Sequence, residues 1–327
     1  MDKQKKILAV NFGGIGDEIL FLPTLISLKK QFPNSKITLA LEPRSKSIKD
    51  LTSIIDDIIL VDIKRKNKYI ELLKFIFKAR GFDIGVTAGG NKFMSIILWL
   101  TGAKKRYGYD TGQLSRLLLT KAVPLNKQQY AVNMYHDLIT PVTEHKTELP
   151  QIDIPEQEKL KNSVLIHPGV SKMSIDKGMI KTIPASVWAE LVNKLIEKGK
   201  HVILAGGPDD EECINTILEN IKAEGLFDNM YGKTKSLKDL AILIAQAEKF
   251  ICSDSAPLHI AVAAGTKTYA IFGPTDDKKL VPPSVTPIKA NDNCEIKPCL
   301  WERRQTTCES LCCLKITADD IIKAVGL

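Results

Sequence analysis

Hydrophobic and polar positions alternate in a repeating order along this chain. Short runs of apolar, often β-branched residues are separated by longer stretches in which apolar residues recur every three or four positions. The short runs are typical of buried strands, and the longer stretches are typical of amphipathic helices. Strands and helices in alternation predict parallel sheets covered by helices on both faces, an α/β fold.

The first half of the chain shows this alternation clearly. One helix is expected over residues 69–80, where Ile70, Leu73 and Phe77 share a face and Gly81 ends the helix. Strands are expected at residues 6–11, 36–41, 58–61 and 82–87.

A polar stretch then interrupts the alternation over residues 144–162 and contains Pro150 and Pro155. We interpret this stretch as an interdomain linker. A chain of 327 residues is also longer than most single domains. We therefore expect two domains, residues 1–155 and residues 156–327.

The alternation resumes after the linker, which predicts a second α/β unit like the first. A closing helix over residues 317–325 has Thr317 as its N-cap and Asp320 in its first turn. Strands are expected at residues 163–167, 201–205, 249–252 and 268–272, and helices at 185–198, 209–220, 236–247 and 257–264.

Composition and the lengths of the apolar runs argue against disorder, a signal peptide and a membrane-spanning helix. Hydrophobic residues make up 44% of the chain and charged residues 26%, which is ordinary for a globular protein and predicts order throughout. The apolar start stops after Val10 at a glycine-rich turn, so it predicts a first strand rather than a signal peptide. The longest apolar run, residues 93–100, is far shorter than the ~20 residues that a membrane-spanning helix needs.

The net charge is +8, with local basic clusters. These clusters suit solvated surface positions, an anionic lipid surface or a phosphorylated acceptor. Nucleic acid is not expected as a partner, because no aromatic residues interleave with the basic ones as a base-stacking platform requires. The clusters are Lys64, Arg65, Lys66 and Lys68; Lys104, Lys105 and Arg106; and Arg303 and Arg304.

The first candidate site follows the first strand, in the segment NFGGIGDEILFLP at residues 11–23. Gly13, Gly14 and Gly16 let the backbone approach a ligand, and the helix that follows points its free N–H groups at that ligand. Asp17 lies in the first turn of this helix, where it is either a functional carboxylate or simply a helix cap.

A dinucleotide-binding turn is the competing interpretation of the same segment. Gly14 and Gly16 fit its first two glycines, and Glu42 follows near the end of the second strand. Ile19 stands where the third glycine belongs. This segment alone leaves a dehydrogenase open.

The second candidate site begins at the strand that ends in IHPG, residues 166–169. A loop follows over residues 171–182, and its serines and lysines suit a diphosphate because they supply donors and positive charge. The residues concerned are Ser171, Ser174, Lys177 and Lys181. Taken singly, Lys172 and Lys177 suit exposed, solvated positions better than a ligand site.

A third segment, CSDSAPLHIAVAAGTKTYAIFGPTD, is the most specific. Asp254 and Ser255 lead from a strand end into a helix near Pro257, and His259 lies in the first turn of that helix. His259 alone suits a structural histidine. A carboxylate, a hydroxyl, an imidazole and free backbone donors at one strand end together predict a ligand site.

These motifs together resemble glycosyltransferase family nine, the lipopolysaccharide heptosyltransferases. The resemblance rests on GGIGD with Pro23, on SDSAPLHIAVAAG and on FGPTD, in this order along nearly the whole chain. It implies the GT-B fold, in which two Rossmann-like parallel-sheet domains face an interdomain cleft. The first domain would bind the acceptor and the second the nucleotide-sugar.

The resemblance also implies an activity and its partners. The protein would be an inverting transferase that uses ADP-heptose, or another activated sugar, and a lipopolysaccharide core or similar lipid-linked glycan as acceptor. We expect a cytoplasmic monomer, peripheral at the inner face of the inner membrane, that needs no cofactor beyond its substrates.

Residue roles follow from the same resemblance. Asp17 takes the place of the general base, Lys181 contacts the donor diphosphate, and Asp254 holds the donor sugar. Ser255 and Ala256 stand where backbone N–H groups meet the phosphates, and His259 lies close to them.

Four positions depart from the family pattern and leave the donor sugar and its nucleotide open. Thr182 and Ile183 replace an arginine and a tryptophan, Ala256 replaces a glycine, and Lys238 stands where some heptosyltransferases have a nucleoside-binding glutamate.

The late cysteines Cys294, Cys299, Cys308 and Cys312, with Cys313 adjacent, are expected to be reduced thiols, and a structural zinc or iron site is the alternative. A catalytic cysteine is not expected, because inverting transfer needs no covalent intermediate.

No metal is expected in catalysis either, because Lys181, the helix after Ser255 and His259 would neutralise the leaving diphosphate. Three alternatives stay open: a GT-B nucleotide-sugar epimerase, a dehydrogenase, and a non-enzymatic metal-binding module.

Overall fold

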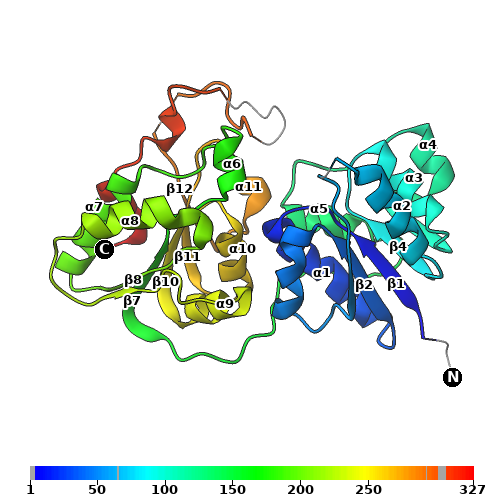
Figure 1. Ribbon diagram of the computed structural model, residues 1–327, viewed down its shortest axis with the longest axis horizontal. Coiled ribbons are helices and arrows are strands. Elements are labelled where there is room, and N and C mark those ends of the chain that lie inside the picture. Colours follow the sequence, from blue (N-terminus) through cyan, green and yellow to red (C-terminus); the bar gives the residue numbers. More distant parts are fainter. Residues whose placement is uncertain (1–3, 65, 292, 301–306) are drawn as a thin grey trace. The chain divides into compact units, whose positions relative to one another are not determined.

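The computed structural model describes residues 4–64, 66–291, 293–300 and 307–327. The chain divides into two compact units, Met1–Asp153 and Ile154–Leu327, and each unit contains one parallel six-stranded sheet with helices on its faces (Figure 1). Arg65, Arg303 and Arg304 of the predicted basic clusters lie outside the described residues.

The sheet of unit 1 has the strand order β3-β2-β1-β4-β5-β6, with every pair parallel. The four predicted strands are present, and the short strands β5 and β6 extend the sheet at one edge. The strands are β1 (Lys6–Val10), β2 (Lys36–Leu41), β3 (Asp57–Leu60), β4 (Ile84–Thr87), β5 (Lys105–Tyr109) and β6 (Lys121–Val123).

The helices of unit 1 differ in how deeply they are buried. Helix α1 is buried continuously from Glu18 to Leu28 and packs against α5 and η1. The helical segments are α1 (Ile15–Gln31), η1 (Pro43–Leu51), α2 (Lys68–Lys78), α3 (Lys92–Leu100), α4 (Gln113–Leu118) and α5 (Ala131–Asp137).

Helix α2 confirms the predicted helix but corrects the face it buries. The predicted apolar stripe of Ile70, Leu73 and Phe77 is exposed to solvent. Phe75 and Ile76 are buried in its place and join the core of the unit. The periodicity was ambiguous because apolar residues occur on both sides of this helix.

Unit 2 repeats the topology of unit 1. Its strand order is β12-β11-β10-β7-β8-β9, again parallel throughout. Three-residue strands β9 and β12, which the sequence did not predict, form its edges. The strands are β7 (Leu160–His167), β8 (His201–Leu204), β9 (Phe227–Asn229), β10 (Ala247–Ser253), β11 (Lys267–Ile271) and β12 (Thr286–Ile288).

The five helices predicted for unit 2 are present close to their predicted positions, and the short segments α6, α11 and η3 were not predicted. The Thr317 hydroxyl accepts a hydrogen bond from the Asp320 amide at 3.2 Å, which confirms the predicted N-cap of α12. The helical segments are α6 (Lys172–Asp176), α7 (Ala185–Glu197), η2 (Pro208–Asp210), α8 (Glu211–Glu219), α9 (Leu237–Gln246), α10 (Ala256–Ala263), α11 (Asp277–Leu280), η3 (Cys312–Leu314) and α12 (Ala318–Val325).

The predicted linker is too long at its carboxyl end, because β7 already begins at Leu160. The pairing of β7 with β10 shifts register between Ala247 and Lys249, and Asn162 adopts a φ of 60° there. Asparagine tolerates this left-handed conformation. Asn162 is thus a polar residue in an irregular part of β7. In the sequence it could not be distinguished from a linker residue, so the predicted linker extends too far.

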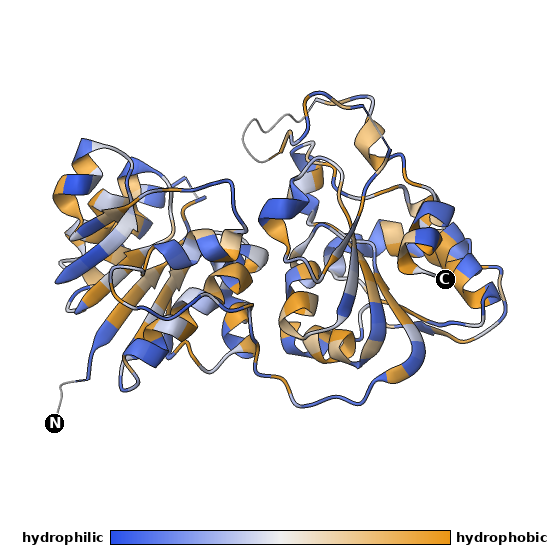
Figure 2. Ribbon diagram, turned by 180° about the vertical axis from the view of Figure 1, so that it is seen from behind, coloured by the Kyte–Doolittle hydropathy of each residue, from blue (hydrophilic) through white to orange (hydrophobic). Residues whose placement is uncertain are grey.

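Both sheets are covered on each face, so their central strands are apolar. Figure 2 shows hydrophobic residues along the strands of each sheet. Residues from strands and helices form the cores, with Leu8, Phe75 and Leu98 in unit 1 and Ile166 and Trp188 in unit 2.

Candidate functional site

The strand order changes direction at the middle of each sheet. This switch point lies between β1 and β4 in unit 1 and between β7 and β10 in unit 2. Open α/β sheets bind ligands there, outside the carboxyl ends of the strands. The predicted glycine turn follows β1 and the Ser253–Ser255 segment follows β10, so the main candidate residues lie at the two switch points.

Asp17 occupies the third position of α1 and faces two hydrogen-bond donors. The Gly14 amide donates to Asp17 Oδ2 at 2.8 Å, which is the geometry of a helix cap. The Tyr135 hydroxyl from α5 lies 3.4 Å from Asp17 Oδ1. One oxygen therefore caps the helix, and among the described residues the other has only the long contact to Tyr135.

Residues of η1 contact the glycine turn that precedes Asp17 and hold it in place. A side chain at Gly13 would collide with the side chain of Asp17, which explains glycine at this position. The Ser45 hydroxyl donates to the Gly13 carbonyl at 3.1 Å. The Arg44 guanidinium lies close to Gly14.

Two buried carboxyl groups lie near Asp17. Glu18 is 1% exposed, and neither of its oxygens has a hydrogen-bond partner of good geometry within the described residues. Burial raises the pKa of Glu18 well above its usual range, and the Asp17 and Glu42 charges raise it further. Glu42 is paired with Arg44 at 2.6 Å and with Lys64 at 2.9 Å.

In unit 2, Lys181 and Asp254 form an ion pair. The Lys181 Nζ atom lies 3.2 Å from Asp254 Oδ2, and the Thr275 hydroxyl donates to the same oxygen at 2.8 Å. Asp254 is buried, whereas Lys181 is about a quarter exposed. The structure thus brings two predicted site residues together and adds Thr275, which the FGPTD motif contained without an assigned role.

A network of hydroxyl groups connects the loop of Lys181 to the sheet. The Ser253 and Thr182 hydroxyls lie 2.8 Å apart, and each is 2.7 Å from the Pro168 carbonyl oxygen. The indole N–H of Trp188 donates to Thr182 Oγ1 at 3.1 Å. Thr182 is one of the departures from the family pattern. Because it is the residue next to Lys181, its hydrogen bonds hold the backbone beside Lys181 in place.

Helix α10 begins directly after Asp254. Ser255 is its N-cap, but the Ser255 hydroxyl accepts no capping bond and has no partner among the described residues although it is buried. Ala256 starts the helix, and His259 is buried in its first turn. A helix N-terminus and an unused hydroxyl next to a lysine favour an anionic ligand.

Ser171 has a local structural role. The predicted loop over residues 171–182 contains the short helix α6, and Ser171 is its N-cap, accepting from the Ser174 amide at 3.3 Å. The serine and lysine composition was interpreted as a loop because such a short helix has no apolar periodicity.

A histidine and an aspartate that the sequence did not single out lie near the same edge. His167 ends β7, and burial lowers its pKa to about 4. Its Nε2 atom is 3.9 Å from Asp210 Oδ2, and burial raises the pKa of Asp210 to about 6. Asp210 also accepts from the Gly207 amide at 2.8 Å.

The late cysteines are free thiols in this structure, and Cys299 and Cys313 are buried. Burial raises the pKa of Cys299, and nearby Cys294 and Cys308 add to the rise. Within residues 4–64, 66–291, 293–300 and 307–327, no three or more His, Cys, Asp or Glu side chains are grouped to hold a metal ion.

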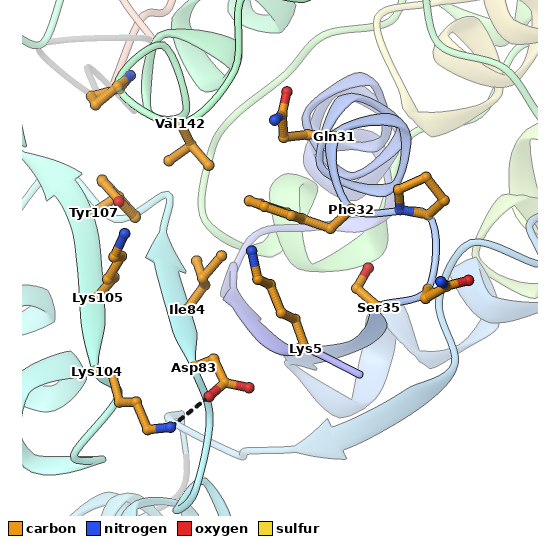
Figure 3. Close-up of a pocket in the computed structure, with 13 residues that line it drawn as sticks. Lys5, Gln31, Phe32, Ser35, Asp83, Ile84, Lys104, Lys105, Tyr107 and Val142 are labelled. Carbon is orange, nitrogen blue, oxygen red and sulfur yellow. Dashed lines mark hydrogen bonds and ion pairs between the residues drawn. The ribbon is translucent and has the colours of Figure 1, made fainter. Parts of the chain in front are cut away.

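A hollow of about 800 Å³ lies elsewhere in unit 1, at the amino ends of the strands (Figure 3). Lys5, Asp83 and Lys104 line it, and Lys104 pairs with Asp83 at 2.8 Å. Ligands of open sheets bind at the opposite edge. We therefore place the candidate site at the carboxyl ends.

Comparisons with known proteins identify the family and the fold. Lipopolysaccharide heptosyltransferase 3 from Escherichia coli is 26% identical over 282 residues, covering 80% of this chain and 81% of the relative. The crystal structure of a family 9 glycosyltransferase from Veillonella parvula DSM 2008 is similar with a TM-score of 0.76 and 23% identity, covering 100% of this chain and 97% of that chain.

A further solved structure, of the E. coli heptosyltransferase WaaC with ADP-2-deoxy-2-fluoro heptose, has a TM-score of 0.73 and 18% identity, covering 98% of this chain and 99% of that chain. These similarities confirm the predicted GT-B fold of two Rossmann-like domains. The model of glycosyltransferase family 9 (heptosyltransferase) matches residues 73–311. The chain therefore belongs to glycosyltransferase family 9.

Proposed function

We propose that this chain is an inverting, metal-independent heptosyltransferase that transfers heptose from ADP-heptose to a lipopolysaccharide core or similar lipid-linked glycan. The observation that carries the proposal is the Lys181–Asp254–Thr275 group, with Asp254 buried and Lys181 partly exposed, beside the N-terminus of α10 at the switch point of unit 2. Heptosyltransferases among the relatives support the choice of sugar.

The donor diphosphate needs positive charge and hydrogen-bond donors. Lys181 is exposed enough to reach a ligand, and Asp254 and Thr275 fix its starting position. The first N–H groups of α10 and the Ser255 hydroxyl add donors without further reorganisation. The Asp254 carboxylate would then be released from Lys181 to accept hydrogen bonds from the sugar hydroxyls.

Inverting transfer is a single displacement. The acceptor oxygen attacks the anomeric carbon, the bond from that carbon to the diphosphate oxygen breaks, and ADP leaves with the bonding electrons. The acceptor hydroxyl loses its proton, and Asp17 is the proposed base because its Oδ1 atom makes a long contact to Tyr135 and no shorter one to a side chain that the structure describes.

Metal independence follows from the charge carried by the chain itself. Lys181, the N-terminus of α10 and His259 would take over the role that a divalent cation has in other transferases. We expect turnover to survive excess EDTA. If chelation abolishes turnover and magnesium restores it, this part of the proposal is wrong.

We also propose that the protein works in the cytoplasm as a monomer, peripheral at the inner membrane, because its acceptor would be lipid-linked. Across the described parts of the chain, no helix combines the length and the hydrophobicity needed to cross a bilayer.

A transfer assay tests the proposal. The purified chain is incubated with ADP-heptose, or with other nucleotide-sugars as controls, and with lipopolysaccharide core acceptors, and products are identified by mass spectrometry. Heptosylated acceptor with inverted anomeric configuration is expected. Release of a changed free sugar without acceptor would instead identify an epimerase, and binding of a nicotinamide cofactor with hydride transfer would identify a dehydrogenase.

A further inference from the structure

Unit 1 carries an exposed apolar face on three neighbouring helices. Of the fourteen large hydrophobic side chains that are exposed in the described part of the chain, four lie on α2, three on α3 and two on α4. Helix α3 contacts both α2 and α4, and the three lie together in Figure 1. We call this surface the α2–α4 face: Tyr69, Ile70, Leu73, Phe77, Phe93, Trp99, Leu100, Leu114 and Leu117.

The apolar residues of the face are arranged in rows rather than scattered. Tyr69, Leu73 and Phe77 are four residues apart and form one ridge along α2. Phe77 is 65% exposed and Leu117 on α4 is 78% exposed. Single exposed apolar residues are ordinary, but a contiguous group of this kind marks an interaction surface.

The charged residues of the same helices are almost all basic. Helices α2, α3 and α4 contain one acidic residue, Glu71, and it is paired with Lys74 at 2.9 Å. Figure 2 shows hydrophilic residues alternating with hydrophobic ones on helices of this unit. The basic residues are Lys68, Lys74, Lys78, Lys92 and Arg116.

Basic side chains on or next to the α2–α4 face make cation–π contacts with its aromatic rings. The Lys68 ammonium is 5.2 Å from the Tyr69 ring centroid, and the Lys92 ammonium is 5.8 Å from that of Phe93. The Arg80 guanidinium, just after α2, is 4.9 Å from the Phe77 ring. Aromatic and leucine side chains with neighbouring lysines are the composition of helices that lie in the interface of an anionic membrane.

We propose that the α2–α4 face docks unit 1 onto an anionic lipid bilayer, with its apolar side chains among the acyl chains and its lysines at the lipid phosphates. A second protein copy fits this face less well, because lysine is depleted from protein interfaces. The inference extends the proposed function, since a lipid-linked acceptor would be met at that surface, but lipid binding itself requires neither donor nor acceptor.

Vesicle flotation of the purified full chain tests the proposal. We expect binding to phosphatidylcholine vesicles that contain roughly 30% phosphatidylglycerol, at least about tenfold weaker binding to pure phosphatidylcholine, and weakening by salt. The double variant Leu73→Gln/Phe77→Gln should reduce binding to the anionic vesicles by about tenfold or more. Lys68→Gln/Lys78→Gln should reduce it by several-fold and flatten its salt dependence.

Leu226→Gln is the matched control, because Leu226 is 68% exposed but belongs to unit 2; it should leave vesicle binding unchanged. All substituted residues are exposed, so melting temperatures should match that of the wild type. Absence of wild-type binding, or binding that the α2 variants leave intact, would overturn the proposal. Concentration-dependent self-association that the Leu73→Gln/Phe77→Gln variant abolishes would assign the face to a second copy and also overturn it.

Turnover with a detergent-dispersed acceptor separates this proposal from the proposed function. It should be the same in the wild type and in the α2 variants. If vesicle binding fails while this turnover persists, only the docking surface is wrong. If vesicle binding holds while no transfer occurs with any donor, the transferase proposal is wrong.

Discussion

The two units share one topology but carry opposite chemistry at their switch points. In unit 1, Asp17, Glu18 and Glu42 gather where β1 and β2 end. In unit 2, Lys181 and the N-terminus of α10 lie at the corresponding edge. The common sheet order therefore gives both units a switch point, and the loops that follow the strands give the two switch points different charges.

The difference supports the distinct tasks that we propose for the two units. A carboxylate with a weakly held oxygen suits proton removal from an acceptor hydroxyl, whereas a lysine beside unused backbone donors suits a diphosphate. Changes in unit 1 should therefore affect turnover, and changes in unit 2 should affect donor affinity.

The largest effect is expected for Asp17→Asn. At the third helical position the amide oxygen of asparagine can still accept the hydrogen bond from the Gly14 amide. Asparagine cannot take up the acceptor proton, so turnover should fall by ~10²- to 10⁴-fold. Steady-state kinetics measures the loss. Asp320→Asn is the matched control, because Asp320 occupies the same capping position in α12; its turnover should be that of the wild type. A folded Asp17→Asn enzyme with near-normal turnover would mean that Asp17 only caps its helix.

Lys181→Ala should come next and should act on binding. Loss of a hydrogen bond to a charged group is worth ~1 to 3 kcal/mol, so nucleotide-sugar affinity should weaken accordingly. Isothermal titration calorimetry measures the change. Lys177→Ala, at an exposed position of the same loop, should bind like the wild type. Equal affinities for all three proteins would remove Lys181 from the donor site.

His167 should make unit 2 sensitive to acid. Its pKa is lowered from 6.5 to about 4 by burial, so between these values the unfolded chain binds more protons than the folded one, and stability falls as pH falls. Between about pH 7.5 and about pH 5, His167 should lower the free energy of unfolding of the wild type by about 2 kcal/mol. The His167→Gln variant should not show this loss. Urea unfolding at both pH values measures the difference. Identical losses in both proteins would show that His167 is not held neutral.

The smallest effect is expected for Tyr135→Phe. The Tyr135 contact to Asp17 is long, 3.4 Å, so its loss should cost about 0.5 to 1.5 kcal/mol of transition-state stabilisation, or roughly twofold to tenfold in kcat. KM for the donor should not change, because Tyr135 belongs to unit 1. A rise in donor KM with unchanged kcat would contradict the division between the units.

The sequence predicted the central strands well. The candidate site residues could be singled out because each strand end carries its own local motif, and their roles stay predictions. Asp254 and Lys181 were found in separate segments, but only the fold shows them 3.2 Å apart. The contact of Thr275 with Asp254 joins loops after two different strands, so no local pattern contains it.

The missed features share a physical cause. Glu18 and His167 have unusual pKa values because they are buried, and burial of a single polar residue in an apolar run leaves no periodic signal. The sequence did not indicate that the stripe on α2 is exposed, because periodicity marks an apolar face without indicating what covers it.

The most direct test of the central claim is the affinity of ADP-heptose for three proteins, measured by isothermal titration calorimetry. The account predicts that Asp17→Asn binds the donor as the wild type does, while Lys181→Ala binds it about 5- to 150-fold more weakly. If Asp17→Asn weakens donor binding as strongly and Lys181→Ala leaves it unchanged, the assignment of the donor to unit 2 and of the base to unit 1 is contradicted.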